Sequence, residues 1–427
     1  MTLQRLLYST LLILAMPIIV LRLLWRSRKN ASYRQGIKSR FAYYSQAERQ
    51  GFSEVKIWVH AVSVGETLAA KPLIAALIAH YGDKTVLVTS TTPTGFDTVQ
   101  RLFANKVQQN YFPNDLPWLV SHALDCVNPQ LFIAIETEIW PNFWHACNKK
   151  NIPLLLANAR LSTRSTQRYQ KILKLVSSTL QQAQLIACRA STDANNFIQL
   201  GANKSTVRVI GDIKWDMKNS DKLAQQGKAF RQHWGDERLV IVAASTHEGE
   251  DKQILSLFNQ LYNNFPTLLL IIVPRHPERF DQVADLIENK QLSLQRRSEQ
   301  QNFLPTTQVV LGDSMGEMQA WFAAADLVIM GGSLVNVGGH NPMEASAYGV
   351  PVISGAAIHN FTEAFDILTQ QGVAFVCDDK AALHQQALSL LSQPLLRKKI
   401  SKIALEIVAQ NKGATNRLME YIKAKVN

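Results

Sequence analysis

GGSLVNVGGHNPMEASAYGVPVISG, residues 331–355, is the stretch of sequence that decides the fold. It follows the short apolar run DLVIM at 326–330, a pattern typical of a buried parallel strand. Asn341-Pro342 then predicts the start of a helix, because Asn is a good N-cap and Pro is tolerated at the first helical position. Glycines let the backbone approach a ligand closely, and several can adopt positive φ: Gly331, Gly332, Gly338 and Gly339.

The start of this helix predicts a ligand site. A helix N-terminus carries unpaired N–H groups and a partial positive charge, which suit a phosphate or the hydroxyls of a ribose. Glu344, in the first turn, could accept hydrogen bonds from such a ribose. A Gly-rich loop alone is also found at ordinary strand–helix corners. Together with the helix start and a following strand at 350–354, it indicates a nucleotide-sugar donor site.

The chain is long enough for two domains. It has 427 residues, 47% hydrophobic and 18% charged, as in a globular protein. Short apolar runs alternate with amphipathic helical stretches such as 67–81 and 95–103, which predicts α/β domains with doubly wound parallel sheets. The first series of strands is expected at 56–61, 85–89, 131–135, 153–157, 185–188 and 207–210. The second series is expected at 239–244, 268–273, 309–311, 327–330, 350–354 and 373–377.

These patterns give expected domain boundaries. A membrane anchor (1–30) precedes a first Rossmann-like domain (31–212), a connection (213–237) and a second Rossmann-like domain (238–380), which contains the predicted donor site. Residues 381–427 are expected to be helical and could return to the first domain. Ligands of open α/β sheets bind beyond the carboxyl ends of the strands, so the loops there hold the candidate site residues.

The N-terminus has the features of a membrane anchor. Residues 6–24 are mostly apolar and just long enough to cross a bilayer. Of a net charge of +12, eight positive charges lie in residues 1–40, which contain no acid. A signal peptide is the rival interpretation, but the basic cluster follows the apolar run and no small-residue cleavage site is present. We expect a single-pass or monotopic anchor on an anionic inner membrane, with the domains in the cytoplasm.

Other partners and cofactors are not expected. No nucleic-acid-binding motif is present. The four cysteines have no metal-like spacing and suit a reducing compartment. No DxD pair follows a predicted strand, and Asp378-Asp379 fits a surface turn, so neither an essential metal nor a cofactor is predicted.

Glu66 is the first candidate catalytic residue. It ends the segment Ser63-Val64-Gly65-Glu66 after the first strand. S-x-x-E is a capping-box pattern, so Glu66 could serve only to satisfy an N-cap amide. It could equally be a general base, because a helix N-terminus would keep it ionised near neutral pH.

Two further acids and a lysine follow other strands of the first domain. Glu136 and Glu138 lie at the end of the strand at 131–135, where buried carboxylates need partners. They could be solvated, but a functional role is favoured. Lys214 lies where the first sheet meets the connection and is by itself a weak signal.

The second domain offers loops suited to a nucleotide. Ser245 to Glu250 is a plausible phosphate-facing turn, and Arg275 between two prolines suits a fixed contact to phosphate or base. Backbone groups at 312–317 could bind a pyrimidine edge.

Together these motifs resemble the bacterial 3-deoxy-D-manno-octulosonic acid (Kdo) transferases, membrane-attached GT-B glycosyltransferases of lipopolysaccharide assembly. The resemblance covers nearly the whole chain. Besides the N-terminal anchor, it includes HAVSVGE (60–66), ETEIWP (136–141), GDIKWD (211–216), ASTHEGE (244–250), PRHPERF (274–280), DSMGEM (313–318) and GGSLVNVGGHNPMEA (331–345).

The resemblance implies transfer of Kdo from CMP-Kdo to a lipid A precursor, lipid IVA, with inversion at the anomeric carbon. It implies Glu66 as the base, with Glu136 and Lys214 supporting the transition state. It places the CMP contacts at Pro274, Arg275, Met315, Gly316, Glu317, Asn341, Pro342, Met343 and Glu344.

Two alternatives remain at the level of sequence. A nucleotide-sugar epimerase shares the two-domain fold but has no obvious use for a membrane anchor. A non-catalytic, membrane-tethered nucleotide-binding protein would bind CMP but tolerate loss of Glu66.

Overall fold

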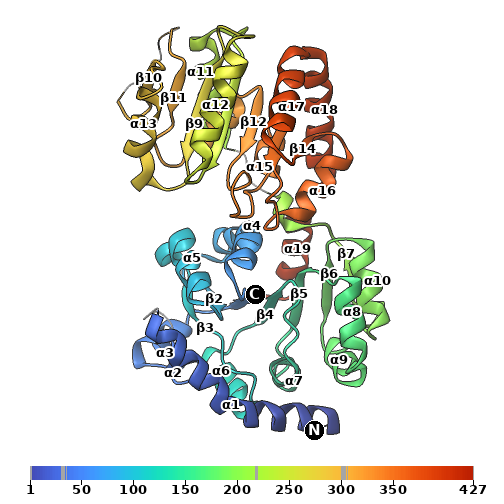
Figure 1. Ribbon diagram of the computed structural model, residues 1–427. Coiled ribbons are helices and arrows are strands. Elements are labelled where there is room, and N and C mark those ends of the chain that lie inside the picture. Colours follow the sequence, from blue (N-terminus) through green and yellow to red (C-terminus); the bar gives the residue numbers. More distant parts are fainter. Residues whose placement is uncertain are drawn as a thin grey trace. The chain divides into compact units, whose positions relative to one another are not determined.

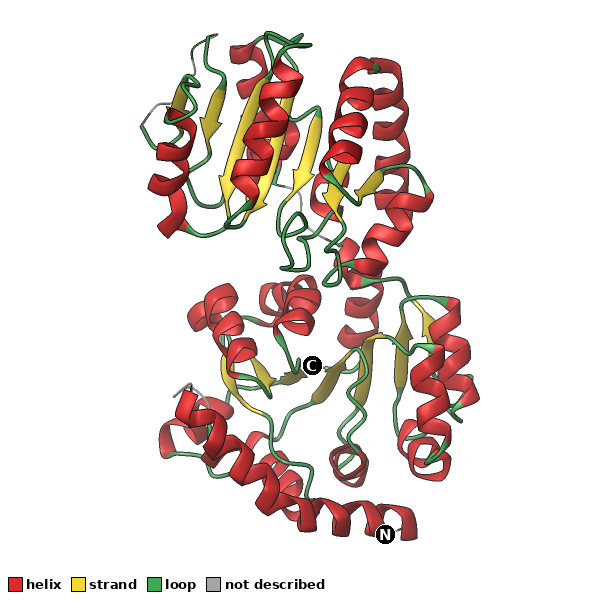
Figure 2. Ribbon diagram, in the orientation of Figure 1, coloured by secondary structure: helices red, strands yellow, loops and turns green. Residues whose placement is uncertain are grey.

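The computed structural model describes residues 2–29, 34, 36–216, 220–299, 304 and 306–426. The chain divides into two compact units, coloured along the sequence in Figure 1. The first unit comprises Met1–Asp216 together with Asn411–Asn427, and the second comprises Met217–Gln410. Each unit contains a parallel sheet flanked by helices (Figure 2), which confirms the predicted α/β class.

The described residues of the first unit form a seven-stranded sheet in the order β3-β2-β1-β4-β5-β6-β7, with parallel neighbours throughout. The order reverses between β1 and β4, and ligands of open α/β sheets bind at such a point. The strands are β1 (Ile57–His60), β2 (Val86–Ser90), β3 (Gln108–Tyr111), β4 (Leu131–Ile135), β5 (Leu154–Ala159), β6 (Leu185–Cys188) and β7 (Val207–Val209). The helices are α1 (Leu3–Lys29), α2 (Ile37–Arg40), α3 (Gln46–Phe52), α4 (Val64–Tyr81), α5 (Pro93–Phe103), α6 (Pro117–Val127), α7 (Pro141–Lys149), α8 (Thr163–Gln170), α9 (Leu173–Leu180), α10 (Ser191–Gln199) and α19 (Ala414–Lys423).

Both faces of this sheet are buried, as expected for a parallel sheet covered by helices. Successive side chains of a strand point to opposite faces, so Trp58 belongs to one core and Val59 to the other. The second of these cores includes Leu418 and Ile422 of α19. The end of the chain therefore completes the first unit.

Polar contacts fix this returning segment. The Asp216 carboxylate accepts hydrogen bonds from the backbone N–H groups of Gly413 and Thr415. The Arg417 guanidinium donates to the carbonyl oxygen of Ile210 from Nε at 2.9 Å. Of the helices expected over 381–427, only α19 belongs to the first unit.

Helix α1 lies along the first unit (Figure 1), and one face of it is docked there. The Tyr8 hydroxyl donates to Asp115 Oδ2 at 3.0 Å, and Ser9 Oγ lies 3.0 Å from Nδ2 of Asn142. Partly or fully buried positions recur at helical spacing from residue 4 to residue 27. The contact therefore runs along almost the whole helix.

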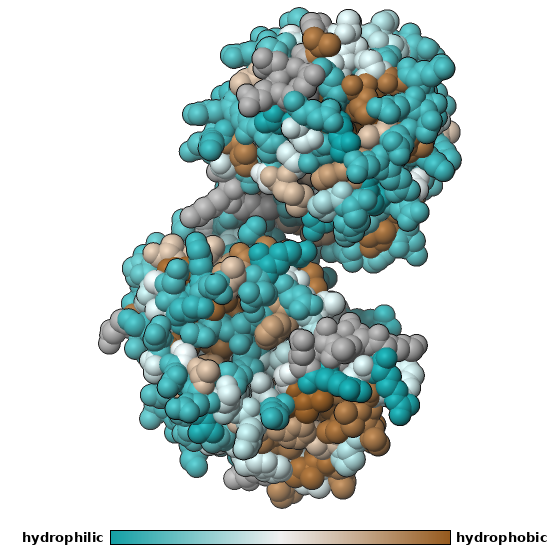
Figure 3. Space-filling view, turned by 90° about the vertical axis from the view of Figure 1, so that its left-hand side faces the viewer, coloured by the Kyte–Doolittle hydropathy of each residue, from teal (hydrophilic) through white to brown (hydrophobic). Residues whose placement is uncertain are grey.

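The opposite face of α1 is apolar and exposed. Its residues are 56–69% exposed at seven positions, Leu3, Leu7, Leu11, Leu14, Ile18, Leu21 and Trp25. Figure 3 shows hydrophobic surface gathered at the lower end of the first unit, where α1 lies. Among the described residues, α1 is the one helix long and apolar enough to cross a membrane.

The described residues of the second unit form another seven-stranded parallel sheet, in the order β10-β11-β9-β8-β12-β13-β14, which reverses between β8 and β12. The strands are β8 (Val240–Thr246), β9 (Leu269–Pro274), β10 (Leu294–Arg296), β11 (Val309–Leu311), β12 (Leu327–Met330), β13 (Val352–Gly355) and β14 (Ala374–Cys377). The helices are α11 (Asp221–Trp234), α12 (Glu250–Tyr262), α13 (Phe280–Glu288), α14 (Met318–Ala324), α15 (Met343–Ser346), α16 (Thr362–Gln370), α17 (Lys380–Ser392) and α18 (Pro394–Asn411).

The segment expected as a connection, 213–237, is not a simple linker. Its α11 packs on α14, and Phe230 and Trp234 stack on Trp321 with ring centroids 4.8 and 6.3 Å apart. At Gly227 an added Cβ would lie 2.4 Å from the carbonyl oxygen of Ala320, so the two helices are in close contact. The packing of α11 on α14 gives residues 221–234 their place in the second unit, and the local sequence pattern does not reveal this packing.

Candidate active site

Glu66 lies in the first turn of α4, directly after β1 and at the reversal point of the first sheet. Its Oε2 accepts a hydrogen bond from the backbone N–H of Val62 at 2.6 Å, and Oε1 lies 3.5 Å from the Ser63 hydroxyl. The Ser63 side chain does not cap the helix. Neither hydrogen bond of a capping box is therefore formed, and the amide that Glu66 satisfies, that of Val62, precedes the N-cap residue.

The ionisation of Glu66 differs from the sequence-based expectation. Burial, followed by the negative charge of Glu138, raises the pKa of Glu66 to about 8, while the Val62 N–H opposes the shift. The expectation that the helix N-terminus keeps Glu66 ionised near neutral pH was wrong, because desolvation outweighs that contribution. A carboxylate with a pKa near the working pH is a stronger base than an ordinary one.

Glu136 and Lys214, expected to act together, are in contact. Lys214 Nζ lies 3.2 Å from Glu136 Oε1. Glu136 directly follows β4 and has φ 62°, a left-handed conformation that is uncommon for a residue other than glycine. Such strain is concentrated at functional sites.

Two side chains position the segment that carries Lys214. Asn158 Oδ1 accepts the backbone N–H of Ile213 at 3.0 Å, and Asp212 Oδ1 accepts that of Lys214 at 2.9 Å. Because Asn158 is buried at the end of β5, next to β4, it brings Lys214 toward Glu136.

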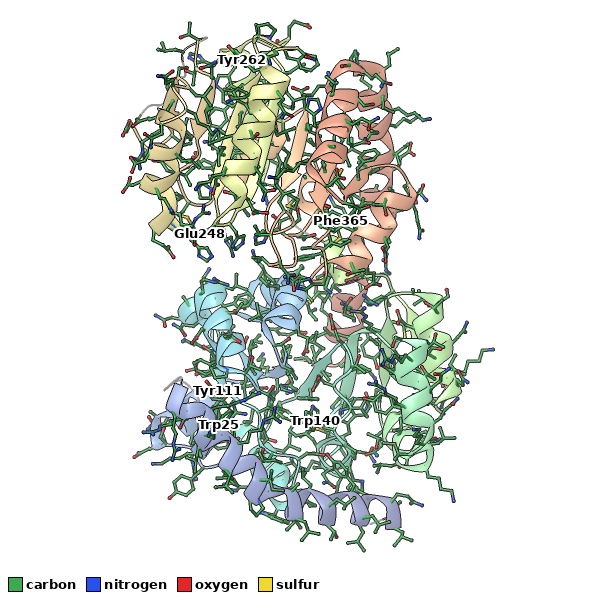
Figure 4. All side chains as sticks on the ribbon, viewed as in Figure 1. Trp25, Tyr111, Trp140, Glu248, Tyr262 and Phe365 are labelled. Atoms are coloured by element: carbon green, nitrogen blue, oxygen red, sulfur yellow. The ribbon has the colours of Figure 1, made fainter. Side chains whose placement is uncertain are left out.

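Glu138 and His60 also belong to this cluster; a functional role was favoured for Glu138 without a specific assignment, and His60 was not among the candidates. Glu138 Oε2 accepts a hydrogen bond from Nε1 of Trp140, labelled in Figure 4, at 2.7 Å. The same oxygen lies 3.7 Å from Nε2 of His60, the last residue of β1. The sequence signal for Glu138 is its place as the second acid of ETEIWP, whereas His60, the last residue of a buried strand, has no comparable signal.

In the second unit, Glu250 shapes the Gly-rich loop. Its carboxylate is fully buried and accepts the backbone N–H groups of His247, Gly332 and Leu334 at 2.7–2.9 Å. Gly331 packs so closely that an added Cβ would lie 2.3 Å from the carbonyl oxygen of Ser245. The loops after β8 and β12 are thus held together at the reversal point of the second sheet.

Arg275 and three histidines, His247, His276 and His340, lie at the same edge of the sheet. Pro274 ends β9 and is buried, while the Arg275 side chain is exposed and its backbone N–H donates to the Thr246 carbonyl oxygen at 3.0 Å. Nε2 of His247 and Nε2 of His340 are 2.9 Å apart, so one ring donates a hydrogen bond to the other. Burial, followed by nearby positive charges, lowers the pKa of His340 to about 4. His276 contacts His247 edge-on, with ring centroids 5.4 Å apart.

The predicted contacts at 315–317 lie in the loop after β11, next to β9 in the sheet. Met315 is 69% exposed, and Gly316 has φ 86°. The Glu317 carboxylate accepts from Nε and Nη2 of Arg297 at 3.0 and 2.8 Å. Because this ion pair occupies the Glu317 side chain, a ligand would meet the backbone here more readily than the carboxylate.

The helix predicted to have Asn341 as its N-cap and Pro342 as its first residue starts one position later and is short. It begins at Met343, has Pro342 as its N-cap residue and makes a single turn, α15. Asn341 Oδ1 still accepts the backbone N–H of Met343, at 3.1 Å. The Met343 side chain is buried and Glu344 is exposed. One turn carries little macrodipole, so the side chains and loop amides must provide most of the attraction for an anion.

Family models match both units. The model for 3-deoxy-D-manno-octulosonic-acid transferase (kdotransferase) matches residues 35–217, and the model for glycosyl transferases group 1 matches residues 228–406. The UDP-GlcNAc 2-epimerase from Neisseria meningitidis, solved with bound UDP-GlcNAc, is 16% identical, with a TM-score of 0.57 over 87% of this chain and 100% of the other. This likeness concerns the fold alone, and it confirms the expected GT-B type with two Rossmann-like domains.

Two relatives match over most of their length. The 3-deoxy-D-manno-octulosonic acid transferase of Haemophilus influenzae is 38% identical over 423 residues, 98% of both chains. That of Bordetella pertussis is 34% identical over 376 residues, 86% of both chains. With one family model over residues 35–217 and these identities over 98% and 86% of the chain, the protein belongs to the 3-deoxy-D-manno-octulosonic acid (Kdo) transferase family and is a glycosyltransferase.

Proposed function

We propose that the protein transfers Kdo from CMP-Kdo to a lipid A precursor of the lipid IVA type, with inversion at the anomeric carbon. The observation that supports this most strongly is the cluster at the reversal point of the first sheet. There a carboxylate with a raised pKa, Glu66, lies near a carboxylate–lysine pair, Glu136 and Lys214.

Each group has a role in a single displacement. Glu66 removes the proton from the acceptor hydroxyl as its oxygen bonds to the anomeric carbon of Kdo. The bond from that carbon to the phosphate oxygen breaks, and its electron pair leaves with CMP. Lys214, held by Glu136, provides positive charge for the developing transition state.

The second unit is proposed to bind the donor. Arg275 and the neighbouring histidines offer donors to a phosphate, and the loop shaped by Glu250 lets the nucleotide approach the backbone. Gly316 and the exposed Met315 would contact the base, and Asn341 and Glu344 the ribose. Because cationic side chains take the charge of the leaving group, we expect full activity in excess EDTA.

Helix α1 is proposed to lie in one leaflet of an anionic inner membrane, on the same side as both units. The contacts of α1 with the first unit, which include the hydrogen bonds to Asp115 and Asn142, extend along almost the whole helix. If α1 crossed the membrane, it would have to separate from the first unit. The exposed apolar face would enter the leaflet, and Arg22 and Arg28, at the end of the helix, would meet lipid phosphates. This arrangement brings the enzyme to a lipid acceptor.

The test is to incubate the purified protein with CMP-Kdo and a tetraacylated lipid A precursor in vesicles, and to record a mass spectrum of the lipid. We expect a mass increase of one or more Kdo units in the lipid and release of CMP. An isomerised nucleotide sugar with unmodified lipid would instead identify an epimerase. Binding of CMP without either product would identify a non-catalytic nucleotide-binding protein.

A further inference from the structure

The segment that follows β5 is strongly basic. Residues 160–174, RLSTRSTQRYQKILK, contain five basic residues and no acid. Three of them, Arg164, Arg168 and Lys171, recur at i, i+4 and i+7 on α8, whose C-cap residue still has helical dihedral angles. All three are exposed, whereas Thr166 on the opposite face is buried. Helix α8 therefore presents a basic face to solvent.

The charge of this face has no counterpart in the surrounding structure. Within the described residues, none of its three side chains forms an ion pair. Helices α1 and α7 pack against α9, α10 packs against α8, and these five helices contain a single acid, Asp193. Asp193 is buried and lies 3.6 Å from Nη2 of Arg189. Because like charges one turn apart repel one another, the basic face suits an anion from outside the chain.

One end of the basic segment adjoins the proposed catalytic cluster. The backbone N–H of Arg160 donates to the carbonyl oxygen of Glu136 at 3.4 Å, and the Thr137 hydroxyl donates to the carbonyl oxygen of Arg160. Burial, followed by the charge of Glu138, raises the pKa of Tyr169 on α8. Helix α8 therefore begins beside the loop that carries both acids.

The other end of the segment adjoins α1. Helix α9 follows α8 (Figure 1) and contacts α1. At the corner between α8 and α9, Ile172 is 51% exposed and Leu173 is 40% exposed, and Lys171 and Lys174 flank them. Lysines beside apolar side chains suit a membrane interface, because their stems lie along apolar surface while their charges stay in water. The basic face thus lies between a membrane-facing corner and the catalytic cluster.

We propose that Arg164 and Arg168 bind phosphate groups on the headgroup of the membrane-embedded glycolipid acceptor. The inference rests on the proposed transfer of Kdo to a lipid. A guanidinium donates paired hydrogen bonds to a phosphate, and two of them one turn apart can contact the same headgroup. The lipid chains then lie toward Ile172 and Leu173, and the acceptor sugar lies toward Glu66.

The experiment compares full-length wild type with Arg164→Gln/Arg168→Gln, using CMP-Kdo and a tetraacylated lipid A precursor in phosphatidylcholine vesicles. The KM for the precursor should rise roughly tenfold or more in the double variant, as expected for lost hydrogen bonds to a charged group. Its kcat and its KM for CMP-Kdo should not change. The matched control, Arg101→Gln/Lys106→Gln, removes two exposed positive charges at the end of α5 and just beyond it, and should leave all three constants unchanged.

The phosphate groups are tested by removing them from the precursor. The dephosphorylated precursor should have a raised KM with wild type, and the double variant should raise that KM no further. If the two losses multiplied, the arginines would contact the vesicle surface rather than the acceptor phosphates, and the proposal would be overturned. An unchanged KM for the phosphorylated precursor in the double variant would also overturn it.

Calorimetry with the deacylated precursor, a water-soluble phosphorylated disaccharide, needs neither turnover nor a membrane. Wild type and the matched control should bind it, and the double variant should bind it roughly tenfold more weakly. Equal affinities in the three folded proteins would contradict the proposal, with thermal unfolding as the check on folding. If wild type bound the disaccharide through these arginines but transferred no Kdo, the proposed function would fail and the binding surface would stand.

Discussion

Lys214 Nζ lies 3.2 Å from Oε1 of Glu136, although 78 positions of sequence separate the two residues. Their side chains are 27% and 18% exposed, so the pair is partly shielded from water. The contact joins the loop after β4 to the segment after β7. The pair therefore fixes the position of the positive charge beside the proposed base.

The pair should show strong coupling in a double-mutant cycle. Lys214→Met leaves Glu136 without its counter-charge and removes the cation, so turnover should fall by about tenfold or more. Adding Glu136→Gln removes the uncompensated charge, so the loss in the double variant should be smaller than the product of the two single losses. Single-turnover rates would measure this. Losses that simply multiply would show that the two side chains act independently.

Glu66→Gln separates a structural role from a catalytic one. The amide oxygen can still accept the Val62 N–H, so folding and CMP binding should be unchanged. As a general base, however, Glu66 should contribute about 10²–10⁴-fold to turnover. Rates of transfer to lipid, with thermal unfolding and CMP calorimetry as controls, provide the test. A rate within a few-fold of wild type would leave Glu136 as the next candidate base.

The pH dependence should follow the ionisation of Glu66. Because the proposed base is active when ionised and its pKa is raised to about 8, chiefly by burial, kcat/KM should increase as the pH rises from neutral toward that value. The low residual kcat/KM of Glu66→Gln should not show this increase between neutral pH and pH 8. A wild-type profile that is already flat across the neutral range would assign the base to a carboxyl of ordinary pKa.

Arg275→Ala tests the donor site. Loss of a hydrogen bond to a charged phosphate should weaken CMP binding by about 1.5–3 kcal/mol. Lys290→Ala is the matched control, because it removes one positive charge from an exposed site just beyond the far end of α13. Calorimetry should show weaker binding only in the first variant. Equal affinities for the two variants would remove Arg275 from the site.

The outward face of α1 should carry the membrane affinity. Leu14→Gln combined with Ile18→Gln replaces two side chains that are each 69% exposed, and should weaken vesicle binding at least tenfold, since burying each contributes about 1.5–3 kcal/mol. Leu395→Gln, at a site 80% exposed in the second unit, should have no effect on sedimentation with anionic vesicles. Equal losses from both variants would point to nonspecific adhesion.

The orientation of α1 has its own readout. If the helix lies in one leaflet, Thr2→Cys should react with an impermeant maleimide added on the side of the two units. If the cysteine at position 2 reacted only with maleimide added on the opposite side of the bilayer, the helix would cross the bilayer.

All the central strands could be predicted from the sequence, but only one of the two edge strands of each sheet, β7 and β14, could be. The continuous apolar runs at β1, β4 and β12 occur because helices cover both faces of a parallel sheet. The two strands that were not predicted, β3 and β10, lie at sheet edges, and their sequences QQNY and LQR lack such a run. Partial exposure removes the pattern on which the prediction depends.

The candidate site was predictable where one residue follows one strand, as for Glu66 and Glu136. Family resemblance implied that Glu136 and Lys214 share a role, but their contact was not predicted, because it depends on Asn158 positioning a distant segment. The raised pKa of Glu66, the place of His60 beside Glu138 and the role of Glu250 depend on burial and on neighbours from other elements. A linear pattern does not contain that information.

The return of α19 to the first unit has a consequence for the synthesis of the protein. Asp216 and Ile210 flank the segment that carries Lys214, and their partners, Gly413, Thr415 and Arg417, are translated after the whole of the second unit. Domains of other proteins commonly fold N-terminal first as the chain emerges from the ribosome. Here the first unit stays incomplete until the second has been synthesised, so a chain that stops before residue 411 would contain Glu66, Glu136 and Lys214 yet leave the lysine segment without its anchor.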